Sequence, residues 1–250
     1  MPHRDLGRSY RFVVAVVRPL LVLLTRRRWC GAQHLPAQGG FVVCSNHLSH
    51  SDPLTLGHYL LDHGHPPYFL AKESLFAIPL IGRVIRGAGQ IPVHRETSDA
   101  VTALTSAVAA VEAGKCIVLY PEGTLTRDPD LWPMVGKSGA ARLALQTGCP
   151  LVPVAQWGPQ VLMSPHSKRL RLLPRPLIQV VAGPQVDLDD LRGRPVDATL
   201  LAEATERIMT AVTDLLLPLR EGTPPQQRFD FHAARGVLRR DLARRRGSRW

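Results

Sequence analysis

Short apolar runs alternate with amphipathic stretches along most of the chain. Apolar runs bounded by Gly, Pro or polar residues are typical of buried strands, and they occur at residues 41–45, 68–71, 90–94, 116–120, 151–156 and 177–181. Helical periodicity is found at residues 52–61, 78–86, 98–112, 137–147 and 198–217. Strands that alternate with helices predict an α/β fold, with a mostly parallel central sheet flanked by helices.

A separate apolar run lies at the N-terminus, over residues 12–24, where Arg18 and Pro19 interrupt it and three arginines and Trp29 follow it. A spanning helix needs about 20 apolar residues, and a secretory signal ends at small residues. An apolar helix flanked by basic residues and Trp is typical of the membrane interface. We therefore predict an N-terminal membrane-interface helix, with a core helix and a transmembrane helix as alternatives.

The positive charge is concentrated at the two ends of the chain. The formal net charge is +11, and residues 1–30 and 235–250 each carry seven Arg against one Asp. A polybasic end attracts lipid headgroups or nucleic acid. These patterns divide the chain into a basic, apolar interface segment (1–30), an α/β domain (31–218) and an Arg-rich C-terminal tail (219–250).

A candidate catalytic pair follows the first predicted strand. Asp52 lies five residues after His47, so the turn can bring its carboxylate to one imidazole nitrogen and leave the other as a general base. The pair lacks a G-x-S-x-G serine, which suggests that the substrate supplies a hydroxyl nucleophile. Two alternatives remain: a turn-capping histidine, or a hydrolase that uses Ser45, Ser49 or Ser51.

Two other strand ends carry groups suited to an anion. Arg95 follows the strand at 90–94, and arginine can bind phosphate in a bidentate manner. After the strand at 116–120, Gly123 allows backbone N–H groups to approach an anion, and Glu122 can accept from a substrate hydroxyl or hold Arg95. The alternative is an ordinary Pro-Gly turn. Since chemistry collects where parallel strands end, we expect these residues to line one cleft.

The chain resembles the glycerolipid acyltransferases, which include the 1-acyl-glycerol-3-phosphate (lysophosphatidic acid) acyltransferases. Residues 46–52 are similar to the N-H-x-x-x-x-D block of that family, 89–95 to its second block, 120–124 to P-E-G-T and 152–154 to V/I-P-V. The four blocks occur in family order. The resemblance implies transfer of a fatty acyl group from acyl-CoA or acyl carrier protein to 1-acyl-glycerol-3-phosphate, giving phosphatidic acid for phospholipid biosynthesis, with no cofactor.

The resemblance also implies roles for single residues. His47 is the expected general base and Asp52 its orienting partner. Lys72 resembles a family lysine near the developing oxyanion, with a plain surface lysine as the alternative. The expected acceptor site comprises Arg95, Glu122, Gly123, Thr124 and Lys137.

The chain differs from the family pattern at one position that bears on the acceptor. Family members often carry Arg directly after P-E-G-T, whereas this chain has Leu125 there and Arg127 two positions later. Either Arg127 makes the anion contact, or the acceptor is another lysophospholipid or a glycolipid.

Metal and nucleic-acid functions are less favoured. The four cysteines lie far apart, and His58, Asp62, His63 and His65 straddle a helix end and a Pro-rich loop, so we expect no metal site. The middle of the chain lacks a basic stripe with interleaved aromatics, so no nucleic acid is expected. A non-enzymatic protein that binds anionic membranes or nucleic acid remains the alternative.

The expected location is the cytoplasmic face of the cell membrane, with peripheral or monotopic attachment. The expected partners are the lipid surface, acyl-CoA or acyl carrier protein, and a lysophospholipid.

Overall fold

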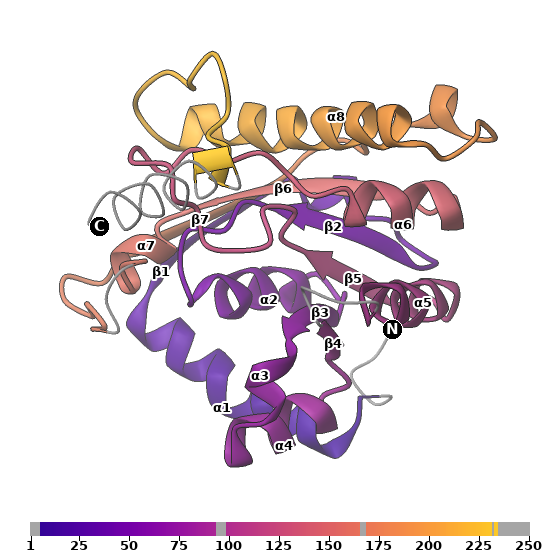
Figure 1. Cartoon of the computed structure of the whole chain (residues 1–250). Coiled ribbons are helices and arrows are strands. Elements are labelled where there is room, and N and C mark those ends of the chain that lie inside the picture. Colours follow the sequence, from indigo (N-terminus) through magenta and orange to yellow (C-terminus); the bar gives the residue numbers. More distant parts are fainter. Residues whose placement is uncertain (1–5, 94–98, 166–168, 232, 235–250) are drawn as a thin grey trace, which may run out of the picture.

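The computed structural model describes residues 6–93, 99–165, 169–231 and 233–234, and its central feature is one seven-stranded sheet with helices on both faces (Figure 1). The strands are β1 (Arg26–Cys30), β2 (Phe41–Ser45), β3 (Pro67–Lys72), β4 (Ile91–Val93), β5 (Cys116–Leu119), β6 (Leu151–Trp157) and β7 (Leu177–Ala182). The α-helices are α1 (Arg8–Leu24), α2 (Asp52–Asp62), α3 (Glu73–Phe76), α4 (Pro79–Gly87), α5 (Asp99–Glu112), α6 (Gly139–Thr147), α7 (Pro159–Leu162) and α8 (Ala198–Leu216). Short 3₁₀ turns are formed by η2 (Ala32–His34), η3 (Asp189–Leu191) and η4 (Leu217–Leu219).

The sheet order is β1-β7-β6-β2-β5-β3-β4, and most of its pairs are parallel. Strands β2 to β6 run in one direction, while β7 is antiparallel to β6 and β1 is parallel to β7. This confirms the predicted α/β fold. The chain passes from β2 to β3 and returns to place β5 between them, then places β6 on the other side of β2. The carboxyl ends of β2 and β5 therefore flank a topological switch point, where α/β proteins usually bind ligands.

The two faces of β2 belong to two halves of the core. Phe41 and Val43 pack with α2 on one face. Val42 and Cys44 pack with α5, α6 and α8 on the other. Because β2 is buried on both faces, its sequence is a continuous apolar run rather than an alternating one.

Sequence periodicity does not predict β1, whose residues it places in the basic N-terminal segment. The structure pairs Arg26 with Leu177 and Cys30 with Val181 at the edge of the sheet. Most β1 side chains are exposed, so backbone pairing holds the strand and no apolar pattern reveals it.

Helix α1 begins at Arg8, ahead of the apolar run, and packs against α2 and α4. Tyr10 and Leu21 are buried, whereas Phe12 and Leu23 are 63% and 67% exposed. Within the residues that the structure describes, no helix combines the length and apolarity needed to cross a bilayer.

The segment after α8 packs against the domain as far as it is described. The Arg220 guanidinium lies 4.0 Å from the Trp132 ring centroid and 4.7 Å from that of Trp157. The Val135 N–H donates to the Phe229 carbonyl at 3.1 Å. The first part of the predicted tail is therefore bound to the domain, and residues 235–250 lie outside the described residues.

Candidate active site

His47 and Asp52 form a hydrogen-bonded pair in the turn between β2 and α2. The imidazole Nδ1 lies 2.8 Å from Asp52 Oδ2, which also accepts from the backbone N–H groups of Leu48 and, at 2.9 Å, Ser49. These bonds fold the start of α2 back onto His47. The spacing of five residues thus achieves the predicted contact.

The surroundings suit His47 to the work of a general base. The Asp52 side chain is fully buried, and burial raises the pKa of its carboxyl, while the bonds from His47 and the two amides oppose that rise. With Nδ1–H directed at the carboxylate, Nε2 carries the free lone pair. The His47 side chain retains 15% exposure, so a substrate hydroxyl can reach it.

The three nearby serines have structural partners. Ser49 Oγ donates to the Met163 carbonyl at 2.6 Å and Ser51 Oγ to the Pro159 carbonyl at 3.2 Å, and both serines are buried. Ser45 is buried as well. Because these hydroxyls stabilise the turn, the geometry argues against the serine-hydrolase alternative.

Asn46 anchors the start of the same turn to β6. Its Nδ2 donates to the Gln156 carbonyl and its Oδ1 accepts from the Gln156 N–H, both at 2.9 Å. Reasoning from the sequence assigned Asn46 no separate role, although it belongs to the N-H-x-x-x-x-D block. It holds His47 at the edge of the sheet.

Glu122 makes two contacts with the backbone that the sequence did not predict. Its Oε1 accepts from the His47 N–H at 3.0 Å, its Oε2 accepts from the Met134 N–H at 3.1 Å, and the side chain is buried. Burial raises the pKa of this carboxyl to about 8. The Thr126 N–H donates to the His47 carbonyl at 2.8 Å. Both Glu122 oxygens are thus engaged by backbone amides, so the loop after β5 holds the backbone of His47.

Tyr120 lies directly against the His47 ring, a contact that was not predicted from the sequence. The two ring centroids are 4.1 Å apart and the rings are 14° from parallel. The Phe69 ring is stacked at 6.4 Å on Tyr120. Burial raises the pKa of Tyr120 well above its ordinary value, so its hydroxyl stays protonated. The aromatic residue before P-E-G-T is the sequence signal for this contact.

Gly123 and Lys137 meet beside the loop after β5. Gly123 has a φ of +69°, and a Cβ there would lie 3.0 Å from Lys137 Cε. The Lys137 N–H donates to the Pro121 carbonyl at 2.8 Å. The left-handed glycine therefore leaves room for the lysine side chain.

Gly123 and Lys137 lie at one end of an amphiphilic groove of about 670 Å³ between α5 and α6. Lys137, Gly123 and the first turn of α6 provide polar groups, and Tyr120 joins the groove to His47. The other walls are mainly apolar and include Leu70, Val93, Leu104, Leu119 and Leu143.

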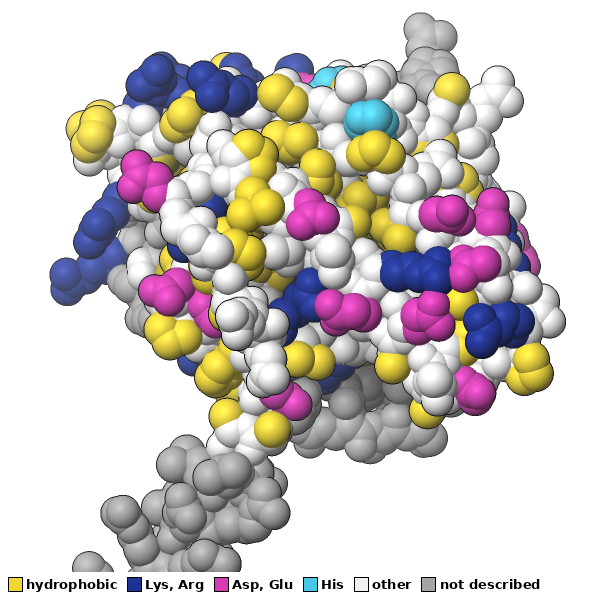
Figure 2. All heavy atoms as spheres, turned by 90° about the horizontal axis from the view of Figure 1, so that it is seen from above, with side chains coloured by type: hydrophobic (Ala, Val, Ile, Leu, Met, Phe, Trp, Pro, Cys, Tyr) yellow, Lys and Arg dark blue, Asp and Glu magenta, His cyan; other side chains and the backbone are white. Residues whose placement is uncertain are grey.

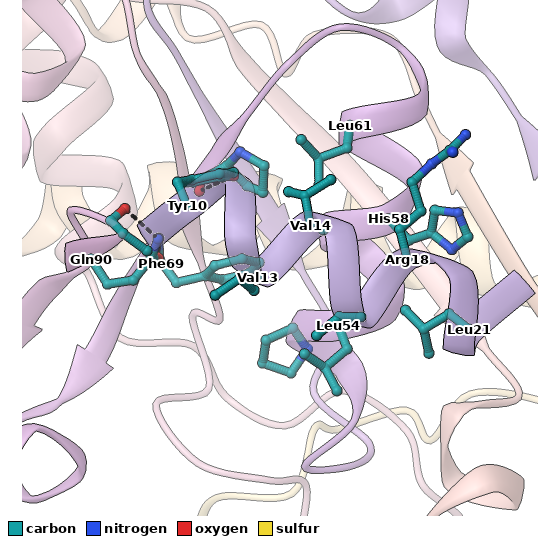
Figure 3. Close-up of a pocket in the computed structure, with 15 residues that line it drawn as sticks. Tyr10, Val13, Val14, Arg18, Leu21, Leu54, His58, Leu61, Phe69 and Gln90 are labelled. Atoms are coloured by element: carbon teal, nitrogen blue, oxygen red, sulfur yellow. Dashed lines mark hydrogen bonds between the residues drawn. The ribbon is translucent and has the colours of Figure 1, made fainter. Parts of the chain in front are cut away.

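A smaller apolar cavity of about 130 Å³ lies between α1 and α2 (Figure 3). Val14 of α1 and Leu54 and Leu61 of α2 line it, with Arg18 and His58 at one end. Phe69 also lines it, and the same ring stacks on Tyr120. The Phe69 ring therefore lies between this cavity and Tyr120.

The remaining predicted residues are less closely tied to the pair. Lys72 is exposed at the carboxyl end of β3, on the same sheet edge as His47. Thr124 is partly exposed. Arg127 is exposed, with its guanidinium 5.9 Å from the Phe231 ring centroid. Arg95 lies outside the described residues.

The histidine-rich end of α2 shows ion pairs rather than a ligand cage. Asp62 pairs with Arg18 at 2.9 Å and accepts from Trp29 Nε1 at 3.1 Å. In the described part of the chain, no three His, Cys, Asp or Glu side chains gather closely enough to hold a metal ion.

The sequence model of a family described as "Acyltransferase" matches residues 26–157, more than half of the chain. This chain belongs to the acyltransferase family. The match spans β1 to β6 and includes His47, Asp52 and Glu122. The acyltransferase region therefore begins with the edge strand that sequence periodicity does not predict.

Several relatives of this acyltransferase are named 1-acyl-sn-glycerol-3-phosphate acyltransferase. The Borreliella burgdorferi protein is 32% identical over 125 residues, or 50% of this chain and 48% of the relative. The chloroplastic BAT2 of Brassica napus is 33% identical, over 55% of this chain and 39% of the relative. The Bacillus subtilis protein is 28% identical, over 60% of this chain and 72% of the relative. The chain thus spans half or less of the first two relatives.

The fold is also known from a solved structure. The 1-acyl-sn-glycerophosphate (LPA) acyltransferase PlsC from Thermotoga maritima superposes with a TM-score of 0.61 at 23% identity. The superposition covers 89% of this acyltransferase and 86% of PlsC. The likeness therefore extends beyond the residues that the family model matches.

Proposed function

We propose that this acyltransferase moves a fatty acyl group from a thioester to the hydroxyl of 1-acyl-glycerol-3-phosphate, giving phosphatidic acid. The observation that carries the proposal is the placement of the His47–Asp52 pair one aromatic ring away from an amphiphilic groove. The names of the relatives point to the same acceptor. The donor in this proposal is acyl-CoA or acyl carrier protein, and no cofactor takes part.

In the proposed mechanism the acceptor phosphate binds near Lys137 and Gly123, with Arg95 as a further anion contact. The acyl chain of the acceptor lies along the apolar walls of the groove. The acceptor hydroxyl then faces His47 Nε2, and Glu122 keeps the backbone of His47 in place.

His47 takes the hydroxyl proton as the oxygen attacks the thioester carbonyl, and the protonated imidazole is stabilised by the Asp52 carboxylate. Lys72 supports the oxyanion from the end of β3. The C–O bond forms, the C–S bond breaks, and the thiolate receives the proton from His47.

The proposed location is the membrane surface. Phe12, Val16, Leu20 and Leu23 are exposed and recur every three to four residues on α1, which forms an apolar stripe on its outer side. Helix α1 then attaches the enzyme to the cytoplasmic face as a peripheral protein. The domain that begins with β1 carries the chemistry, because β1 belongs to the sheet, and the Arg-rich end of the chain adds positive charge.

The direct test measures thiol release and phosphatidic acid from purified full-length protein, acyl-CoA and 1-acyl-glycerol-3-phosphate. His47→Ala is expected to lower the rate by about 10²–10⁴-fold. His50→Ala is the matched control, because His50 is exposed three residues away in the same turn. Full activity of His47→Ala would overturn the mechanism.

The Leu125 departure supports a second candidate, in which another lysophospholipid or a glycolipid is the acceptor. A panel of acceptors separates the two, and Lys137→Met is expected to raise KM for phosphate-bearing acceptors more than for uncharged ones. If no acceptor is acylated while the protein still binds anionic vesicles or nucleic acid, the non-enzymatic alternative holds.

A further inference from the structure

Helix α4 presents an unpaired apolar face to solvent. Leu80 is 70% exposed and Ile81 is 47% exposed, and Leu75 and Ile78 just before them are each 41% exposed. The opposite side of α3 and α4 is packed against the protein, since Phe76 of α3 and Gly82 of α4 are buried. A Cβ at Gly82 would lie 2.0 Å from the Phe76 carbonyl oxygen, so α3 and α4 form one tight unit. The apolar side chains of α4 therefore project to solvent from a closely packed pair of helices.

The apolar face of α4 lies next to α1, and the two helices are in close contact. A Cβ at Gly87 would lie 2.4 Å from Ser9 Oγ, so the end of α4 and the start of α1 meet without a side chain between them. Figure 1 shows α1, α3 and α4 together at the bottom of the molecule, away from α8. The exposed residues of α4 and the exposed Phe12 of α1 therefore belong to two neighbouring helices on the same side of the molecule.

The charges around this surface are mostly positive. Arg8 and Arg11 are exposed on α1, Arg83 and Arg86 are exposed on α4, and neither helix contains an acidic residue. The one acidic residue of the α3–α4 unit is Glu73, at the start of α3.

The face that carries α8 differs, because acidic and basic side chains are interspersed there (Figure 2). On α8, Arg207 pairs with Glu203 at 2.6 Å. A basic rim around apolar side chains is thus a property of the α1–α4 side, and it complements an anionic lipid surface.

We propose that α4 is a second lipid-contacting element, which inserts beside α1 so that the protein docks on anionic bilayers through both helices. The proposal extends the proposed function, which assigns membrane contact to α1 alone. The α3–α4 unit connects β3 to β4, and Leu70 and Val93 of these strands line the amphiphilic groove. Contact through α4 therefore brings the groove to the surface where a lipid acceptor lies.

The test is flotation of the full chain with phosphatidylcholine vesicles that contain or lack phosphatidylglycerol. Loss of one buried leucine side chain should lower partitioning about tenfold or more, so Leu80→Glu and Ile81→Glu are both expected to show this loss. Arg83→Gln with Arg86→Gln should weaken binding severalfold on phosphatidylglycerol vesicles and leave binding to pure phosphatidylcholine unchanged.

Val196→Glu is the matched control. Val196 is 49% exposed, close to the value for Ile81, and lies just before α8. Its binding should equal that of the unchanged chain, and thermal unfolding should show that all variants are folded.

Wild-type-like flotation of Leu80→Glu and Ile81→Glu overturns the proposal, as does an equal loss for Val196→Glu. If Leu80→Glu only converts a dimer to a monomer in sedimentation and leaves vesicle binding intact, a second copy of the chain covers this face and the proposal is wrong. Vesicle binding needs no acyl transfer, so a chain without transferase activity can still show the α4-dependent loss. Failure of the proposed function is thereby distinguished from failure of this inference.

Discussion

The Glu122 carboxyl group accepts a hydrogen bond from the backbone N–H of His47 at 3.0 Å, although the two residues are 75 positions apart. The second Glu122 oxygen accepts from Met134 at 3.1 Å. One buried side chain therefore joins the turn after β2 to both ends of the loop after β5. The glutamate of the P-E-G-T block holds His47 in register with the groove.

Glu122 should make stability depend on pH. Its pKa is raised by burial to about 8, so between its ordinary range near 4.5 and pH 8 the folded protein holds a proton that the unfolded chain has lost. Stability contributed by the protonated form is present at low pH and falls as pH rises through this window. Glu122→Gln cannot ionise, so its thermal unfolding should change less between pH 5 and pH 8 than that of the unchanged chain.

The comparison needs both proteins at each pH, because Asp52 and other acids titrate in both. An equal decrease in melting temperature for the two proteins would show that Glu122 titrates normally. Glu122→Gln should also lower kcat, since the amide nitrogen of Gln opposes one backbone N–H donor.

Asp52→Asn should lower kcat by about 10²–10⁴-fold with little effect on the fold. The variant keeps the shape of the side chain and an acceptor for the Leu48 and Ser49 amides, but it removes the charge that orients and stabilises the imidazolium. Asp214→Asn, on the exposed side of α8, is the control. Retention of half the activity or more by Asp52→Asn would show that the contact with His47 is only structural.

Tyr120 is expected to act as a positioning residue through its ring. Tyr120→Leu removes the stack on His47, and a stacked aromatic contact is worth about 0.5–1.5 kcal/mol, so kcat should fall about twofold to tenfold. Tyr120→Phe keeps the ring and should restore most of kcat. If Tyr120→Phe lowers kcat as much as Tyr120→Leu does, the hydroxyl rather than the ring is responsible for the effect.

Arg220 should stabilise the domain through its two tryptophans. Arg220→Ala removes the stacked guanidinium between Trp132 and Trp157 and should lower the free energy of unfolding by about 1–2 kcal/mol. Arg220→Lys keeps the charge without the planar group and should recover only part of this loss. Arg194→Ala, at an exposed arginine before α8, should change stability by less than about 0.5 kcal/mol. If Arg220→Ala and Arg194→Ala lower the free energy of unfolding equally, the contact of Arg220 with the two tryptophans does not stabilise the domain.

The local sequence determined the helices and strands that have a clear apolar pattern, and the contacts between residues that are close in the chain. β2, α2 and α5 occur where their patterns predict them, and five residues between His47 and Asp52 suffice for their hydrogen bond. These features depend on neighbours in the chain, so periodicity and turn chemistry reveal them.

Only the tertiary structure decided the features that depend on distant partners. β1 exists because β7 offers backbone groups to pair with, and its Arg-rich sequence carries no strand pattern. Glu122 serves the backbone of His47, and Tyr120 stacks on its ring, because the sheet order places β5 beside β2. The sequence by itself determined which residues are available for acyl transfer. Their burial and contacts were decided by strand order, since a side chain's surroundings come from strands that are far away in the chain.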